Sequence, residues 1–155
     1  MILAARDEER SVNESVSSML AQDYSGMLEV IAVNDRSTNR TGEILDELVT
    51  RFPDRLRVSN VESLPEGWLG KTYALYIGAA QATGEWLLFT DADVIFSAAC
   101  ADRAVCYAID NELDYLTLPS EIVYRSVLLR SFVAAFTLVF DMTQRPWLVS
   151  DPQAK

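Results

Sequence analysis

Acidic side chains follow an apolar run at residues 85–90, and their type and spacing suit a metal ligand. The run ends in Asp91-Ala92-Asp93, where one small residue separates two carboxylates. Mg²⁺ and Mn²⁺ take one or two carboxylates from a protein and complete their shell with phosphates and water. The spacing therefore predicts a divalent-cation site at Asp91 and Asp93. The alternative is a pair of solvated turn residues or helix caps.

Two further residues have types that suit a nucleotide. Asp35 follows the apolar run at 28–33 and could accept a hydrogen bond from a base or ribose, although an ordinary turn is an equal alternative. Lys71 stands at an expected helix start, where its ammonium and the backbone N–H groups would both face an anion. A solvated surface lysine is the alternative there. The surrounding glycines do not form a Walker phosphate loop, since Pro65 occupies the position of its first glycine.

The charge balance and the missing residue types exclude several classes of function. Asp and Glu outnumber Lys and Arg 23 to 13, giving a net charge of −10, so we expect no nucleic-acid partner. The chain has no histidine, which argues against a zinc site and a Ser-His-Asp centre. A bound metal should therefore be a hard cation on oxygen ligands.

Short apolar runs alternate with segments of helical spacing along the whole chain. We expect strands at 2–5, 28–33, 55–58, 85–90 and 115–118, and helices at 12–20, 44–52, 71–83, 98–109 and 127–140. The alternation predicts one α/β domain over 1–155, with a mostly parallel sheet flanked by helices. Ligands bind such sheets at the carboxyl ends of the strands. The segment 127–140 is too short to span a bilayer and should pack in the core, with a membrane-surface helix as the alternative.

Four segments, in order along the chain, resemble motifs of family 2 inverting glycosyltransferases. They are residues 4–9, 34–41, 64–75 and 83–94, with departures from the family pattern at Ala4, Asp7, Asn34 and Asn39. The third segment is similar to the branch that acts on lipid acceptors such as hopanoids and carotenoids. The resemblance implies the GT-A fold, a Rossmann-like nucleotide-binding sheet joined to an acceptor-binding part.

The resemblance also implies a set of donor-binding residues and a cofactor. By position, the nucleotide-sugar site would comprise Ala5, Arg6, Glu8, Asp35, Lys71, Asp91, Ala92 and Asp93. Mn²⁺ or Mg²⁺ would be held by Asp91 and Asp93. The implied reaction is an inverting transfer of a hexose, from UDP-hexose or another nucleoside diphosphate sugar, to an acceptor hydroxyl on a lipid or polyisoprenoid.

The ends of the chain depart most from the family. The family's first strand begins before Met1, and its catalytic base would lie beyond Lys155, so the catalytic residue is unknown. We expect a donor-binding fragment, truncated at both ends and weak or inactive by itself. The first residues lack a signal-peptide pattern, so we expect a cytoplasmic protein. In the full-length protein it would lie at the cytoplasmic face of the membrane, with peripheral contact through the missing C-terminal part.

Two alternatives remain open from the residues. A haloacid-dehalogenase-like phosphotransferase would use Asp91 as its nucleophile, but its Asp-x-Asp strand is normally the first, and this chain has no lysine between Lys71 and Lys155. The second alternative is a nucleotide-binding module without catalytic activity.

Overall fold

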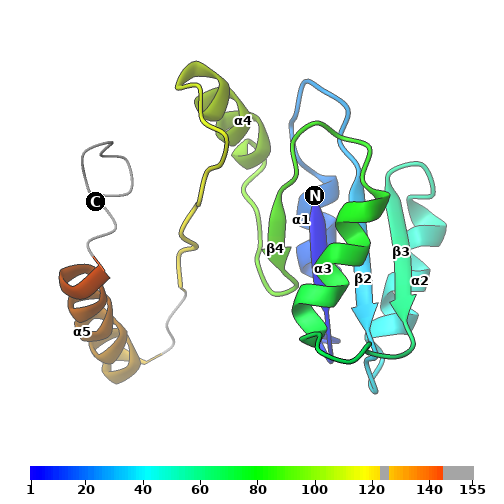
Figure 1. Cartoon of the computed structure of the whole chain (residues 1–155), viewed down its shortest axis with the longest axis horizontal. Coiled ribbons are helices and arrows are strands. Elements are labelled where there is room, and N and C mark those ends of the chain that lie inside the picture. The colour runs from blue at the N-terminus through cyan, green and yellow to red at the C-terminus, as the bar shows by residue number, and fades with distance from the viewer. Residues whose placement is uncertain (123–125, 145–155) are drawn as a thin grey trace. The chain divides into compact units, whose positions relative to one another are not determined.

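The computed structural model of this chain describes residues 1–122 and 126–144 (Figure 1). The chain divides into two compact units, Met1–Thr117 and Leu118–Lys155. The first unit contains the sheet, helices α1 to α4 and every predicted site residue. In the second unit, the described residues include the helix α5 (Val127–Gln144).

The sheet has four parallel strands, which confirms the predicted α/β class. They are β1 (Ile2–Ala5), β2 (Val30–Asp35), β3 (Leu56–Val61) and β4 (Phe89–Asp91), in the order β3-β2-β1-β4. The two central strands are almost entirely buried, because helices cover both faces of a parallel sheet. In the sequence, the continuous apolar runs at 2–5 and 28–33 indicate strands that are buried on both faces.

Helices cover the two faces unequally. α1 (Val12–Leu20) and α2 (Thr41–Arg51) enclose one core together with Leu3 and Ala5, the side chains that β1 turns to that face. α3 (Gly70–Gln81) covers the opposite face, where Ile2 and Val33 point (Figure 1). The period of two along a strand separates these two sets of side chains. α4 (Cys100–Asp110) follows β4.

Small side chains let α3 lie close to the sheet. Ala74 and Gly78 are buried against β1 and β2. A methyl group added at Gly78 would lie 2.5 Å from Ile2 Cγ2 and 3.3 Å from Val33 Cγ2. The first distance is shorter than carbon atoms tolerate, so only glycine fits at this contact.

The structure corrects two predicted strands. β4 begins at Phe89 rather than at 85, although Ile2 N already donates to the Leu88 carbonyl over 2.8 Å. No strand forms at 115–118, where Tyr115 is 69% exposed and Leu118 is 50% exposed. An apolar run becomes a strand only where a neighbouring strand pairs with its backbone groups, and no strand within residues 1–122 and 126–144 pairs with residues 115–118.

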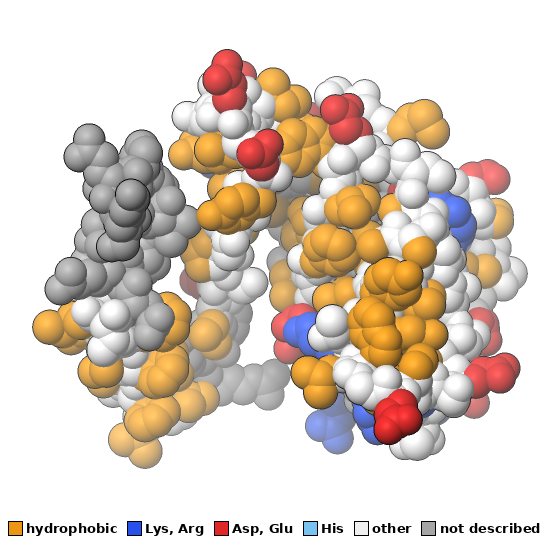
Figure 2. All heavy atoms as spheres, in the orientation of Figure 1, with side chains coloured by type: hydrophobic (Ala, Val, Ile, Leu, Met, Phe, Trp, Pro, Cys, Tyr) orange, Lys and Arg blue, Asp and Glu red, His pale blue; other side chains and the backbone are white. Residues whose placement is uncertain are grey.

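The expected core-packing helix at 127–140 is also corrected. α5 forms, but its apolar side chains are exposed; Val127, Leu128 and Phe132 are 83%, 81% and 68% exposed. Figure 2 shows apolar side chains on the surface of the second unit, and a further apolar patch over α3 in the first. Among residues 1–122 and 126–144, no helix is long and apolar enough to cross a bilayer.

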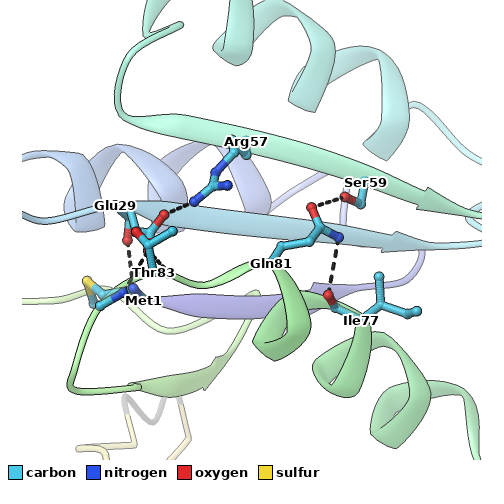
Figure 3. Close-up of polar contacts among 8 residues, drawn as sticks. Met1, Glu29, Arg57, Ser59, Ile77, Gln81 and Thr83 are labelled. Atoms are coloured by element: carbon cyan, nitrogen blue, oxygen red, sulfur yellow. Dashed lines mark hydrogen bonds and ion pairs between the residues drawn. The ribbon is translucent and has the colours of Figure 1, made fainter.

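The half-buried carboxylate of Glu29 ties three segments together at the amino end of the sheet (Figure 3). Its Oε1 accepts hydrogen bonds from Thr83 N at 2.6 Å, from the Thr83 hydroxyl at 2.9 Å and from Gly84 N at 3.2 Å. Its other oxygen forms an ion pair with Arg57 of β3. Glu29 thereby links the start of β2 to β3 and to the segment that follows α3.

Candidate functional site

An open pocket of about 390 Å³ lies at the carboxyl ends of β1, β2 and β4. The ends of these three strands and the first turn of α3 supply its walls. Its lining residues are Ala4, Arg6, Glu8, Asp35, Gly70, Lys71, Asp91, Ala92 and Asp93. The pocket therefore lies where the topology of a parallel sheet places ligands.

The structure brings together seven of the eight residues assigned to the site from the sequence. The eighth, Ala5, has a side chain that is 0% exposed and lies in the core beside Leu3. Ala4 lines the pocket in its place, because successive residues of a strand point to opposite faces. The sequence interpretation also missed Gly70, although that residue precedes Lys71 directly.

Asp35 is held in place by its neighbour. The Asp35 side chain is nearly buried, and Arg36 Nε donates to its Oδ1 over 2.8 Å. This hydrogen bond raises the pKa of the Arg36 guanidinium. Arg36 has φ 54°, a left-handed backbone that turns its side chain back onto Asp35. A base or ribose that contacts Asp35 would meet a carboxylate of fixed orientation.

Gly70 brings the start of α3 against this pair. A methyl group added at Gly70 would lie 2.8 Å from Arg36 Nη2 and would overlap the Asp35 carboxylate. The absence of a side chain therefore lets the N-terminus of α3 reach the pocket. The free backbone N–H groups there add partial positive charge to this wall.

Asp7 fastens the segment after β1 to the segment after β2. Its Oδ1 accepts hydrogen bonds from Thr38 N at 2.7 Å and from the Thr38 hydroxyl at 3.2 Å, and its own N–H donates to Ser37 Oγ at 3.1 Å. The hydrogen bond from the Thr38 backbone is the main cause that lowers the pKa of Asp7. Asp7 also has a left-handed backbone, with φ 58°. In the sequence, Asp7 stands out only as a departure from the family pattern. Its role in joining the two segments was not predicted, because its partner Thr38 lies about thirty residues away in the chain.

Asp91 and Asp93 stand on the opposite wall, both exposed, with buried Ala92 between them. The Lys71 ammonium forms an ion pair with Asp91 across the pocket. This pair shows that the Asp91 carboxylate faces the pocket and accepts a cation there. Residues 1–122 and 126–144 hold no cluster of three or more His, Cys, Asp or Glu side chains with metal-binding geometry. Two carboxylates fit a cation of the Mg²⁺ class that takes its remaining ligands from a phosphate and water.

The charges of the pocket set a condition on any anionic ligand. Its lining has four carboxylates and two cationic side chains, those of Arg6 and Lys71. A diphosphate that entered this pocket alone would meet an excess of negative charge. A divalent cation at Asp91 and Asp93 would offset that excess.

Comparison with known proteins shows the family of this chain. Residues 1–131 match the family model described as glycosyl transferase family 2. A 4,4'-diaponeurosporenoate glycosyltransferase from Staphylococcus haemolyticus is 32% identical over 128 residues, covering 81% of this chain and 32% of the relative. The chain spans about a third of the length of the curated relatives it matches.

Two solved structures share the fold. TarS from S. aureus in complex with UDP has a TM-score of 0.59 and 22% identity, over 77% of this chain and 37% of that one. The mannosyltransferase PcManGT from Pyrobaculum calidifontis, in complex with GDP-Man and Mn²⁺, has a TM-score of 0.56 and 29% identity, over 63% and 28%. These likenesses confirm the predicted GT-A fold.

Proposed function

Because the chain belongs to glycosyl transferase family 2, we propose that its pocket binds the nucleotide-sugar donor of a glycosyl transfer reaction. The observation that carries this proposal is the convergence of Asp35, Lys71, Asp91 and Asp93 on one pocket, from segments far apart in the sequence. Family membership also removes the support for the haloacid-dehalogenase alternative.

The proposed roles follow from the two walls of the pocket. Asp35, fixed by Arg36, would accept hydrogen bonds from the base or ribose. Arg6 and Glu8 would line the nucleoside, and Lys71 at the start of α3 would meet the diphosphate. UDP-hexose is the proposed donor. The two solved structures are complexes with UDP and with GDP-Man, so uridine and guanosine nucleotides are the pair to compare.

Asp91 and Asp93 would hold Mn²⁺ or Mg²⁺, which offsets the charge that develops on a departing diphosphate. The proposed transfer is inverting and needs a general base within hydrogen-bond reach of the acceptor. No residue of this chain is assigned that role. The catalytic step is therefore a proposal for the whole protein, of which the donor pocket is one part.

The proposed acceptor is an apolar molecule of the polyisoprenoid class. Its support is the name of the curated relatives, which act on 4,4'-diaponeurosporenoate. The resemblance of residues 64–75 to the lipid-acceptor branch points the same way. The donor site can be tested without knowledge of this acceptor.

The test is calorimetric titration of the chain with UDP and with GDP, each with and without Mn²⁺. We expect UDP to bind in a Mn²⁺-dependent manner, and Asp93→Ala to abolish that dependence. Asp110→Ala, which removes an exposed carboxylate at the end of α4, is the matched control and should bind as the parent does. A cooperatively melting protein that binds neither nucleotide would contradict the proposal.

A further inference from the structure

The ion pair between Lys71 and Asp91 joins the two walls of the pocket. Lys71 belongs to the first turn of α3, and Asp91 is the last residue of β4. The backbone of Lys71 has little freedom, since Gly70 lies against Asp35 and Ala74 is buried against the sheet. Its side chain is 61% exposed and that of Asp91 is 55% exposed, so the ammonium can move while the helix stays in place.

This arrangement assigns one carboxylate two tasks. Asp91 is one of the two acids proposed to hold the cation, yet its Oδ1 already accepts a hydrogen bond from the Lys71 ammonium. A divalent cation at Asp91 would repel that ammonium at short range. The Lys71 ammonium and the metal therefore weaken each other's binding to the Asp91 carboxylate. If the metal bound Asp93 alone, it would have a single protein ligand.

We propose that Lys71 stands in for the metal in the donor-free protein, and that the donor diphosphate draws Lys71 away from Asp91 as the metal takes its place. The inference rests on the proposed function, because it uses the same diphosphate and the same cation. The exchange leaves the net charge of the pocket unchanged, because the divalent cation enters together with the two negative charges of a nucleotide-sugar diphosphate. With no donor, the lysine offsets Asp91; with donor, lysine and metal together offset the diphosphate.

The strength of the pair makes this exchange reversible. A solvent-exposed ion pair changes an equilibrium by no more than about fivefold. Lys71 therefore lowers metal affinity without blocking the site. Because coupling between two ligands is reciprocal, the factor by which the nucleotide raises metal affinity equals the factor by which the metal raises nucleotide affinity. Part of that factor would come from the displaced lysine.

The proposal predicts opposite effects of one substitution on two ligands. Lys71→Met keeps the length of the side chain and removes its charge. We expect this variant to bind Mn²⁺ about three- to fivefold more tightly than the parent when no nucleotide is present. We expect it to bind UDP with Mn²⁺ more weakly, because the ammonium no longer reaches the diphosphate. Lys71→Arg, which keeps the charge, should resemble the parent in the first measurement.

The readout is the electron paramagnetic resonance signal of free Mn²⁺, which falls as the ion binds. Each protein is titrated with Mn²⁺ alone and again at saturating UDP. Arg51→Met is the matched control: it removes one exposed positive charge at the last residue of α2, outside the pocket lining, and should leave Mn²⁺ affinity unchanged. Circular dichroism confirms that each variant is folded.

The outcomes separate this inference from the proposed function. If the parent binds Mn²⁺ with UDP but Lys71→Met binds Mn²⁺ alone no more tightly than the parent, the inference is overturned and the donor site stands. If neither protein binds Mn²⁺ even with UDP, both are overturned. A rise in Mn²⁺ affinity in Arg51→Met equal to that in Lys71→Met would assign the effect to net charge and overturn the role of Lys71.

Discussion

Replacing Glu29 by alanine should destabilise the sheet from the end opposite the pocket. The substitution removes one acceptor that serves the Thr83 backbone, the Thr83 hydroxyl and the Gly84 backbone, together with the ion pair to Arg57. Each of these groups loses a partner on a carboxylate that is only 24% exposed. The start of β2 and β3 would keep their backbone hydrogen bonds, but the segment after α3 would lose its side-chain tie to the sheet.

The magnitude follows from the number and exposure of these contacts. A hydrogen bond to a charged group contributes about 1.5–3 kcal/mol where water is excluded. Thr83 and Gly84 are exposed, so water replaces much of what they lose, and the exposed Arg57 pair contributes less than about 1 kcal/mol. We therefore expect a total loss of about 2 kcal/mol in the free energy of unfolding. With a urea slope of about 2 kcal/mol/M, the midpoint should fall by about 1 M.

Urea unfolding followed by circular dichroism measures this loss. Glu43→Ala is the control, since Glu43 forms an ion pair with Arg40 in which both side chains are 69% exposed. That variant should remain within about 0.5 kcal/mol of the parent. Equal midpoints for Glu29→Ala and Glu43→Ala would show that the shared carboxylate adds no more than an ordinary surface pair, and the reasoning would be wrong.

Three further outcomes are expected. Gly78→Ala should lose about 1–2 kcal/mol of stability in the same urea assay, despite the better helix propensity of alanine, because its methyl group would overlap Ile2; a gain would contradict the close contact. Gly70→Ala should weaken UDP binding about tenfold by calorimetry, since its methyl group displaces the Asp35 carboxylate; unchanged binding would exclude Asp35 from the site. The folded-state pKa of Asp7 lies below 3.8, so its contribution to stability is present above that pH and is lost as the pH falls through the lower, folded value. Asp7→Ala should therefore have a flatter dependence of melting temperature on pH below about pH 4, and an unaltered slope would contradict the role of that carboxylate.

The sequence was sufficient to predict the class of fold and the edge of the sheet that carries the pocket. Buried parallel strands need apolar residues on both faces, so Ile2–Ala5 and Val30–Asp35 stand out as continuous runs. Once these strands are parallel, the residues that follow them must meet at one edge. Arg6, Asp35 and Asp91 lie together for that reason.

Features that depend on a partner could not be predicted. The run at 115–118 has the composition of a strand, but in the described part of the chain no strand pairs with it. The helix α5 has the apolar spacing of a core helix, yet its apolar side chains are exposed. The contact of Lys71 with Asp91 is set by the packing of α3 on β1 and β2 and by the pairing of β4 with β1, which no local pattern encodes. The position of Ala4 in the pocket was predictable, since the alternation along β1 selects it over Ala5.

The left-handed backbone of Arg36 has a consequence for attempts to make this protein more heat-resistant. A non-glycine residue in that conformation costs about 1–2 kcal/mol, which glycine avoids. Against this gain, Arg36→Gly removes the guanidinium that donates to the nearly buried Asp35 carboxylate, a hydrogen bond that contributes about 1.5–3 kcal/mol. A screen for thermostable variants should therefore not select glycine at this position, although glycine suits the backbone there. The backbone cost of Arg36 is offset by the contact that orients Asp35, so stability and ligand binding favour the same residue.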